Sequence, residues 1–317
     1  IRLKQKSPDQ SVALVEKGGE VGAHILSGAV IDPGGLDQLL PDWRSDGSPL
    51  VTPVTKDIFR LLTCKGSLGL PTPIMPRLMS NHGNYVGSLG ALCRWLAGKA
   101  EALGVEIYPG FAATEALYDA NGQVIGVATG DVGIEKNGLP GPGFQPGVEL
   151  HARYTVLAEG VRGSISKQVI RRFDLAAGRD PQKYGIGLKE LWEIDPAKHQ
   201  PGRIEHSFGW PLDWKTGCGS FLYHFENNQV AVGFVVHLNY KNPYLSPFQE
   251  FQRFKTHPLV RATLEGGRRI SYGARAISEG GWQSVPKLSF PGGILVGDAA
   301  GFVNVPRIKG SHNAVQS

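Results

Sequence analysis

The sequence has little of several features that would assign a protein to a class at once. Its 317 residues include three cysteines, Cys64, Cys93 and Cys218, which lie far apart and form no CxxC pair. Neither a disulfide framework nor a four-thiolate cluster can be built from them, and a reducing compartment is the default expectation. No apolar run reaches the roughly 18 residues of a spanning helix, and there is no internal repeat. These absences leave a globular protein with, at most, a peripheral membrane contact.

Charge of one sign is also scarce, because 33 lysines and arginines face 28 acids and give a formal charge of +5. This mildly basic balance suits an anionic membrane face or an acidic partner. No lysine-rich run or RNA-binding motif is present, so we expect no nucleic-acid partner. The length predicts a large core in two lobes. Because the chain opens on Ile1 and stops at Ser317 inside an expected helix, we expect a piece of a longer protein without a targeting segment.

The stretch from Pro291 to Ala314 predicts a strand, a tight turn and a helix. An apolar run at 294–296 leads directly into Gly297 and Asp298, the pattern of a buried strand that enters a turn. Ligands of α/β sheets bind outside the carboxyl ends of strands, and glycine permits close backbone approach. Asp298 could therefore accept the hydroxyls of a sugar-like chain.

The helix in this stretch is expected to begin at Gly310, with Ser311 and His312 in its first turn. Its free N–H groups would face an anion or an electron-rich ring, which suits a flavin. The alternative is an ordinary strand, turn and helix with a surface aspartate.

Three predicted strands end in an acid within two residues, at Glu16, Glu159 and Asp298. The acid at the end of the second strand of a dinucleotide-binding unit holds ribose hydroxyls, and Glu16 has this place, although the GxGxxG turn would fall before Ile1. An acid after a strand is otherwise most often solvated. Because parallel strands bring their carboxyl ends to one edge, we expect the three acids to gather there.

Residues 18–43 mix glycines with large apolar side chains such as Leu36 and Trp43. Glycines near a cofactor permit close approach, while the leucines and Trp43 could lie in a membrane interface. The alternative is that these side chains belong to the core.

Other segments predict their elements by local signals. Residues 86–103 have helical spacing, and Asn121-Gly122 is a hairpin turn. Residues 49–76 predict a loop or short hairpin, and 138–147 a flexible loop. Short strands over 184–240 predict an antiparallel sheet, inserted between the other pieces.

With these pieces in place the chain resembles the electron-transfer flavoprotein–ubiquinone oxidoreductase family across nearly its whole length. The resemblance is carried by eight long matches: VEKGGEVGAH (15–24), NHGNY (81–85), EGVRG (159–163), GIGLKELW (185–192), GSFLYH (219–224), NPYLSPFQEFQ (242–252), YGARAISEGG (272–281) and NVPRIKGSH (304–312). It implies an α/β fold with an α+β insertion, in which an FAD-binding Rossmann-like domain of the glutathione-reductase and flavin-hydroxylase type carries an antiparallel-sheet quinone-binding domain. The implied divisions are 1–165 and 271–317 for the FAD-binding domain and 166–270 for the ubiquinone-binding domain.

The resemblance also implies an enzyme that takes electrons from reduced electron-transfer flavoprotein and passes them to ubiquinone. Such an enzyme carries FAD and a 4Fe-4S cluster, whose cysteine ligands, like the glycine-rich FAD fingerprint, are not in this sequence. It is monotopic on the mitochondrial inner membrane or a bacterial cytoplasmic membrane, with residues 18–43 part of the membrane-facing surface. This segment alone is then not expected to accept electrons efficiently.

Site residues follow from the resemblance position by position. For FAD, it implies Glu16 at the adenosine ribose, Glu159 and Gly160 as a second contact, Gly297 and Asp298 at the ribityl chain, and Gly310, Ser311 and His312 at the flavin ring. It places ubiquinone near Cys218 and Gly219, where the family commonly has two glycines, so the bulk of Cys218 is a departure. No residue is expected to be a catalytic acid or base.

Two rival interpretations remain open. A related FAD-dependent reductase of an isoprenoid double bond would share the turns at Glu159 and Asp298. A second alternative is an inactive fragment that serves at most as a partner-binding piece, since it lacks the first strand of its dinucleotide-binding domain.

Overall fold

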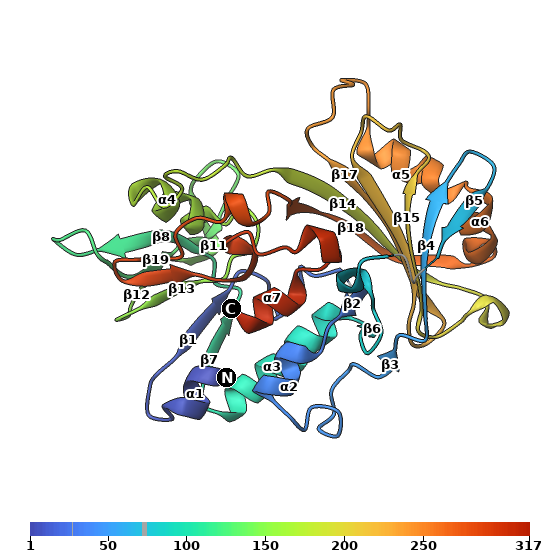
Figure 1. The fold of residues 1–317 in the computed structure, drawn as a ribbon. Coiled ribbons are helices and arrows are strands. Elements are labelled where there is room, and N and C mark those ends of the chain that lie inside the picture. Colours follow the sequence, from blue (N-terminus) through green and yellow to red (C-terminus); the bar gives the residue numbers. More distant parts are fainter. Residues whose placement is uncertain (27, 72–74) are drawn as a thin grey trace.

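The computed structural model describes residues 1–26, 28–71 and 75–317. Figure 1 shows two lobes: one contains short parallel strand pairs and most of the helices, and the other is built around one large, strongly twisted sheet. The N- and C-termini both lie in the first lobe. This arrangement agrees with the two lobes expected from the chain length.

The large sheet has seven strands in the order β18-β14-β17-β16-β15-β4-β5. Neighbours are antiparallel except for β15 and β4, which run parallel. The strands are β4 (Lys56–Leu62), β5 (Ser67–Leu70), β14 (Tyr184–Glu193), β15 (Arg203–Gly209), β16 (Cys218–His224), β17 (Gln229–His237) and β18 (Arg268–Ser278). The expected antiparallel sheet over 184–240 is therefore confirmed. It also recruits the β4–β5 hairpin, which the sequence predicted only as a local unit, so the division at residues 166 and 270 stays a proposal.

One face of this sheet is covered by α5 (Pro247–Lys255) and α6 (Pro258–Leu264). Ser246 caps α5 by accepting a hydrogen bond from the Gln249 amide, and the helix directs Phe251 and Phe254 onto the sheet. Both rings stack near Phe234 of β17, within the largest hydrophobic cluster. The opposite face is therefore the one that meets the other lobe.

The first lobe contains two parallel ladders. Strand β1 (Ala13–Glu16) pairs with β7 (Glu106–Pro109), and β13 (Thr155–Leu157) pairs with β20 (Gly293–Leu295), which in turn pairs with β19 (Ser289–Phe290). Helix α4 (Ser164–Arg172) buries Ile165 and Val169 against β13 and β20. No ladder joins β1 to β13 within the ranges that the structure describes. The predicted common edge therefore brings the strands of Glu159 and Asp298 side by side, while the strand of Glu16 belongs to a separate pair.

A second core of this lobe forms around α3 (Leu89–Ala102), whose first turn is capped by Ser88. It includes α2 (Gly34–Leu39) and the sheet β2-β6-β3, with β2 (Ala29–Ile31), β3 (Thr52–Pro53) and β6 (Tyr85–Gly87). Leu36 is 1% exposed and Trp43 0% exposed in this cluster. The expectation that these side chains face a membrane is wrong for this fold, because both are core residues and the Trp43 indole donates to Asp37.

A three-stranded sheet, a two-stranded pair and several short helices complete the fold. Strands β8 (Ala113–Tyr118), β9 (Val124–Thr129) and β12 (Glu149–His151) form one sheet, which confirms the hairpin at Asn121-Gly122. Residues 138–147 are not the flexible loop that was expected, because β11 (Pro140–Gln145) pairs with β10 (Val132–Ile134). The short helices are α1 (Arg2–Lys6), α7 (Ser311–Gln316) and the 3-10 turns η2 (Arg77–Met79), η3 (Pro196–Lys198), η4 (Trp282–Ser284), η5 (Gly297–Ala299) and η6 (Val305–Arg307).

Candidate cofactor site and the adjoining sheet face

Asp298 lies in η5, directly after the carboxyl end of β20. Gly297 has a φ of +56°, a left-handed conformation that glycine adopts without strain, and this sharp turn places the acid at the strand end. The carboxylate accepts a hydrogen bond from the hydroxyl of Ser278 on β18 and one from the Val303 amide. Burial raises the pKa of Asp298, and these donors oppose that shift. Asp298 therefore joins the turn of one lobe to the large sheet of the other.

Glu159 has a different environment from the one expected for a cofactor ligand. Its carboxylate accepts hydrogen bonds from the Ile165 amide at 3.2 Å, from the Ser166 amide at 2.6 Å and from the Ser166 hydroxyl at 2.7 Å. These donors lie in the first turn of α4, so Glu159 satisfies amides that the helix leaves free. Next to it, Gly160 has a φ of +72°, and a Cβ there would meet nothing within 4 Å. The open backbone at Gly160 is thus better placed for a ligand than the engaged carboxylate.

Glu16 ends β1 and folds back on its own turn, where its Oε1 accepts the Gly18 amide at 2.7 Å. It is half-buried. The strand end and the turn are those that the sequence predicted. Glu16 lies in a different sheet from the strands that lead to Glu159 and Asp298, because β1 pairs with β7 and β13 pairs with β20.

The helix expected from Gly310 is α7, with Gly310 as its N-cap. It packs against η5, where the Ser317 hydroxyl accepts the Gly297 amide at 2.9 Å. Ser311 is half-buried, and His312 is 5% exposed. Burial, together with the nearby Arg307, lowers the pKa of His312, so the imidazole is neutral at pH 7. The structure therefore packs the turn of Asp298 against α7 through Ala314 and Ser317, near the end of that helix.

Three charged residues beside α7 escaped the sequence interpretation. Asp32 accepts the Gly34 amide at 2.9 Å and pairs with Arg307 at 2.7 Å. Lys309 is 6% exposed, and burial lowers its pKa to about 8. The Asp-Pro-Gly-Gly sequence at 32–35 could have predicted the turn at Asp32. The ion pair between Asp32 and Arg307 could not be predicted, because the two residues are 275 positions apart in the sequence.

The sheet face that looks toward this lobe is unusually poor in side chains. Directly opposite residues of neighbouring strands point to the same face, and the register aligns Gly185 with His237, Gly187 with Val235 and Val235 with Gly219. A Cβ at Gly219 would meet nothing within 4 Å, whereas a Cβ at Gly187 would lie 3.0 Å from the Ile277 side chain. Gly219 therefore opens onto free space on the face of the sheet opposite α5 and α6.

Cys218 points away from that space. It is paired with Val236, whose side chain lies in the cluster under α5 and α6, and its Sγ lies 3.7 Å from the Gly209 carbonyl oxygen. Burial raises the pKa of this thiol. The bulk of Cys218 thus falls on the helix-covered face and leaves the space at Gly219 clear.

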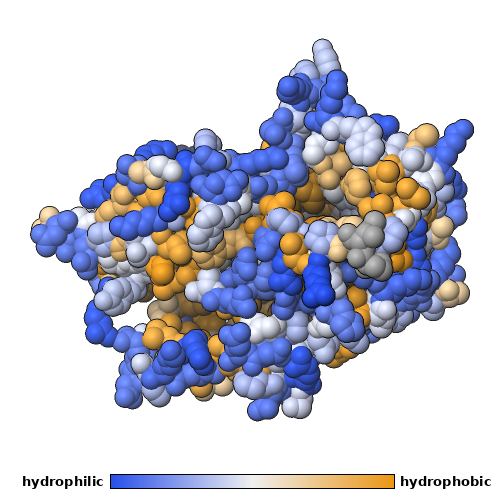
Figure 2. All heavy atoms as spheres, in the orientation of Figure 1, coloured by the Kyte–Doolittle hydropathy of each residue, from blue (hydrophilic) through white to orange (hydrophobic). Residues whose placement is uncertain are grey.

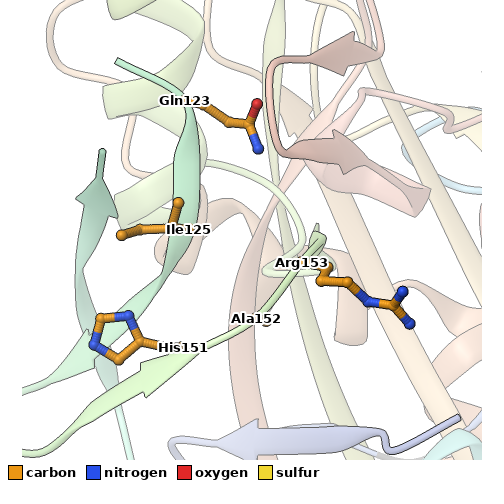
Figure 3. Close-up of a pocket in the computed structure, with 5 residues that line it drawn as sticks. All are labelled: Gln123, Ile125, His151, Ala152 and Arg153. Atoms are coloured by element: carbon orange, nitrogen blue, oxygen red, sulfur yellow. The ribbon is translucent and has the colours of Figure 1, made fainter. Parts of the chain in front are cut away.

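The surface agrees with this geometry. Figure 2 shows a recess with largely hydrophobic walls in the area where Figure 1 draws β14 and β17. A separate open hollow, drawn in Figure 3, is lined by Gln123, Ile125, His151, Ala152 and Arg153. It contains none of the predicted site residues.

Solved structures show which class of protein has this fold. The chain resembles a geranylgeranyl bacteriochlorophyll reductase-like protein from Thermoplasma acidophilum with a TM-score of 0.70, at 16% identity, covering 99% of this chain and 71% of that one. It also resembles the chondrochloren halogenase of a myxobacterium, described as a variant of FAD-dependent halogenases, with a TM-score of 0.61 at 17% identity, covering 98% and 67%. The fold is that of FAD-dependent flavoproteins, as the sequence predicted.

The sequence comparisons are more specific. Residues 184–277 match the family model described as "ETF-QO, ubiquinone-binding". The whole chain is 57% identical to the mitochondrial electron transfer flavoprotein-ubiquinone oxidoreductase of Rattus norvegicus and 56% identical to that enzyme from Pseudomonas aeruginosa, covering 52% and 58% of their lengths. The chain belongs to the electron transfer flavoprotein-ubiquinone oxidoreductase family and spans about half the length of these relatives.

Proposed function

We propose that this chain forms the FAD-holding and ubiquinone-binding part of an oxidoreductase that accepts electrons from reduced electron-transfer flavoprotein and reduces ubiquinone to ubiquinol. The observation that carries the proposal is a coincidence of two results. The matched ubiquinone-binding region contains Gly185, Gly187 and Gly219, and of these three only Gly219 has open space where a Cβ would stand, while Asp298 is hydrogen-bonded to Ser278 on β18 of the same sheet. A planar ring could lie on the bare backbone there without displacing a side chain.

The donor set around Asp298 fits a flavin dinucleotide. The carboxylate at the end of β20 would accept ribityl hydroxyls, and the amides of Gly310 and Ser311 at the start of α7 would face the electron-rich side of the ring. Glu16, at the end of β1, is proposed for the adenosine ribose, with Gly160 rather than the engaged Glu159 carboxylate as the close backbone contact. When bound, the flavin supplies the one- and two-electron chemistry, while these residues orient it and tune its potential.

Ubiquinone is proposed to contact Gly219 and the backbone of Cys218 in the recess over β14 and β17. The apolar walls would exclude water and hold an apolar quinone, and the bare strand would leave room for its ring.

The 4Fe-4S cluster belongs to the proposed whole enzyme and needs ligands from elsewhere. In the described part of the chain, no group of three or more His, Cys, Asp or Glu side chains is placed to hold a metal. Membrane association is proposed for the whole enzyme as well, on the mitochondrial inner membrane or a bacterial cytoplasmic membrane. No helix among the described residues is long and apolar enough to cross a bilayer.

The test is an absorbance spectrum and an anaerobic ubiquinone titration of the natural protein that carries this sequence. We expect bound yellow flavin, reduced by electron-transfer flavoprotein and reoxidised by quinone. Asp298→Asn should weaken flavin binding, while Asp42→Asn, at an exposed position, should not. A protein that holds no flavin, or whose reduced flavin ignores quinone, contradicts the proposal. Reoxidation through reduction of an isoprenoid double bond would instead favour the related reductase.

A further inference from the structure

Lys183, His237 and Glu279 form a chain of polar groups at the end of the large sheet. The Lys183 Nζ lies 2.8 Å from the His237 Nδ1, and the His237 Nε2 lies 3.4 Å from the Glu279 Oε2. The Lys183 carbonyl also accepts the Glu279 amide at 2.7 Å, which fixes the two ends of the chain relative to each other. The imidazole therefore stands between an amine and a carboxyl group, with one ring nitrogen facing each.

The row of polar groups formed by Lys183, His237 and Glu279 lies next to the proposed quinone site. His237 pairs with Gly185 and packs over Gly217, and a Cβ on either glycine would collide with the Glu279 carboxyl group or the His237 ring, respectively. The next row of the same sheet face is the one that ends at Gly219. The neighbour of Glu279, Ser278, donates its hydroxyl to Asp298. The three polar groups thus lie between the proposed quinone contact and the proposed flavin contact.

The three polar groups differ in burial, so one end of the row is nearer to solvent than the other. The Glu279 side chain is 5% exposed, and its Oε2 is a buried oxygen without a hydrogen-bond partner among the described residues. The His237 side chain is 25% exposed, and Lys183 is half-buried. A buried, unpartnered carboxyl oxygen is costly unless a proton or a ligand satisfies it. The Glu279 end is therefore the inner end, and Lys183 is the end nearer solvent.

Building on the proposed function, we propose that Lys183, His237 and Glu279 form a proton relay that carries protons from solvent to the quinone reduced in the recess over β14 and β17. Reduction of a quinone to a quinol takes two electrons and two protons, and the relay supplies the protons while the reduced flavin supplies the electron pair.

Each proton moves by balanced steps. The O–H bond of Glu279 breaks as an O–H bond forms on a quinone oxygen. The carboxylate then takes the Nε2 proton of His237, whose Nδ1 takes a proton from the Lys183 ammonium group. Lys183 is reprotonated by water. Each passage leaves the imidazole proton on Nδ1 instead of Nε2, so before the next passage the partly exposed ring returns to its Nε2–H form by giving the Nδ1 proton to water and taking one at Nε2. Two such cycles leave the relay unchanged and the quinone as quinol.

The electrostatics are compatible with these roles. Burial and the neighbouring Lys183 lower the pKa of His237, which keeps the ring neutral with Nδ1 free to accept from Lys183. Burial raises the pKa of Glu279, although Lys183 opposes the shift, so the carboxyl holds a proton more readily than an exposed glutamate does. Lys183 faces both groups from the segment before β14, and Asp298 approaches through Ser278 from η5.

The test uses the FAD-loaded natural protein and the variants His237→Gln, Glu279→Gln and Lys183→Met. We expect quinone reduction to fall roughly a hundredfold, within the range of general acid catalysis, with an altered pH profile and a larger solvent isotope effect. Reduction of the flavin by dithionite should keep its wild-type rate. His151→Gln, a change at an exposed histidine on β12, is the matched control. Lys183→Arg keeps the charge but holds its proton too tightly to pass it on, so it should not recover the rate.

A second readout does not depend on turnover. Infrared difference spectra recorded on flavin reduction should show the carbonyl band of a protonated carboxyl group that is absent in Glu279→Gln. If the variants keep the wild-type rate, pH profile and isotope effect, or if this band survives in Glu279→Gln, the relay is wrong even though the enzyme is active. A wild-type protein that binds flavin but ignores quinone refutes the proposed function and the relay's delivery to quinone together.

Discussion

The Lys255 Nζ lies 2.8 Å from both carboxylate oxygens of Glu190, and the two side chains are 14% and 2% exposed. The pair joins α5 to the helix-covered face of β14. Glu190 also accepts hydrogen bonds from Arg269 at 3.2 Å and from the Trp192 indole at 2.8 Å. The buried carboxylate is thus balanced by several donors, of which Lys255 is the most buried cation.

Lys255→Met should lower the free energy of unfolding by about 3 kcal/mol, because it leaves a buried carboxylate with one charged partner fewer. Urea unfolding measures the change. The control is Arg268→Met, which breaks the Arg268–Glu193 pair, with side chains 78% and 52% exposed, and should cost less than about 1 kcal/mol. If the two variants lowered the free energy of unfolding equally, the burial of Glu190 would make no difference to the strength of its ion pair.

Trp43→Ala should destabilise the protein by about 3–5 kcal/mol, because it empties a fully buried site and removes the bond to Asp37. Trp214, which is 80% exposed, is the matched control, and Trp214→Ala should stay within roughly 0.5 kcal/mol. Thermal and denaturant unfolding measure both. If Trp43 instead lay in a membrane interface, its loss would weaken vesicle binding and leave the unfolding of the protein in the absence of lipid unchanged.

Gly219→Ala and Gly233→Ala should differ in their effects, because the first is expected to impair quinone binding and the second to reduce stability. A Cβ at Gly219 enters free space, so folding should change by less than about 1 kcal/mol while the KM for quinone rises. A Cβ at Gly233 collides with the Phe221 ring, so this variant should lose about 1–3 kcal/mol of stability. Unfolding curves and steady-state kinetics on the flavin-loaded protein check both. An unchanged KM in Gly219→Ala would remove Gly219 from the quinone site.

The free energy of unfolding should depend on pH partly through His206. Burial lowers its folded-state pKa from 6.5 to about 3, and its Nε2 lies 2.7 Å from the Tyr223 hydroxyl. Between these two values the unfolded chain binds a proton that the folded protein refuses. The contribution is therefore fully present above about pH 6.5 and is lost as the pH falls toward 3, with a slope of roughly 1.4 kcal/mol per pH unit.

His206→Asn should reduce that slope, whatever it does to stability at pH 7. Buried His224, whose pKa is also lowered to about 3, contributes in the same direction and should leave part of the slope in place. Urea unfolding at several pH values between 5 and 7 measures the effect. The exposed His151 is the control, since His151→Asn should leave the slope as it is, and an unaltered slope in His206→Asn would mean that His206 titrates freely in the folded state.

Local signals predicted most elements of this fold, because strand and helix periodicity and turn residues act over few residues. The strand before Glu16, the hairpin at Asn121-Gly122 and the turn and helix around Asp298 all lie where the sequence predicted them. The error at 138–147 has a physical cause: its composition is typical of a loop, but Gly133 lets β10 approach the Gly143 backbone so closely that no side chain fits between them.

Long-range partners were less predictable. The sequence placed an acid after the strand that ends near Glu159, but not the hydrogen bonds by which Ser166 engages it. The sequence likewise showed no sign that Lys183, His237 and Glu279 would meet, since they lie at the ends of three different strands. Such groupings depend on sheet order, and strand patterns carry little information about which strands become neighbours.

The parallel pairing of β4 with β15 also means that β4 is synthesised well before the strand with which it pairs. Phe59 is opposite His206, so β4 leaves the ribosome roughly seven to thirty seconds before its partner at ordinary rates of synthesis. Until then both outer edges of the β4–β5 hairpin are unpaired, and unpaired strand edges promote association with other chains. Closing so long a loop is slow, and chaperone binding to this hairpin during translation would be the natural safeguard for the fold.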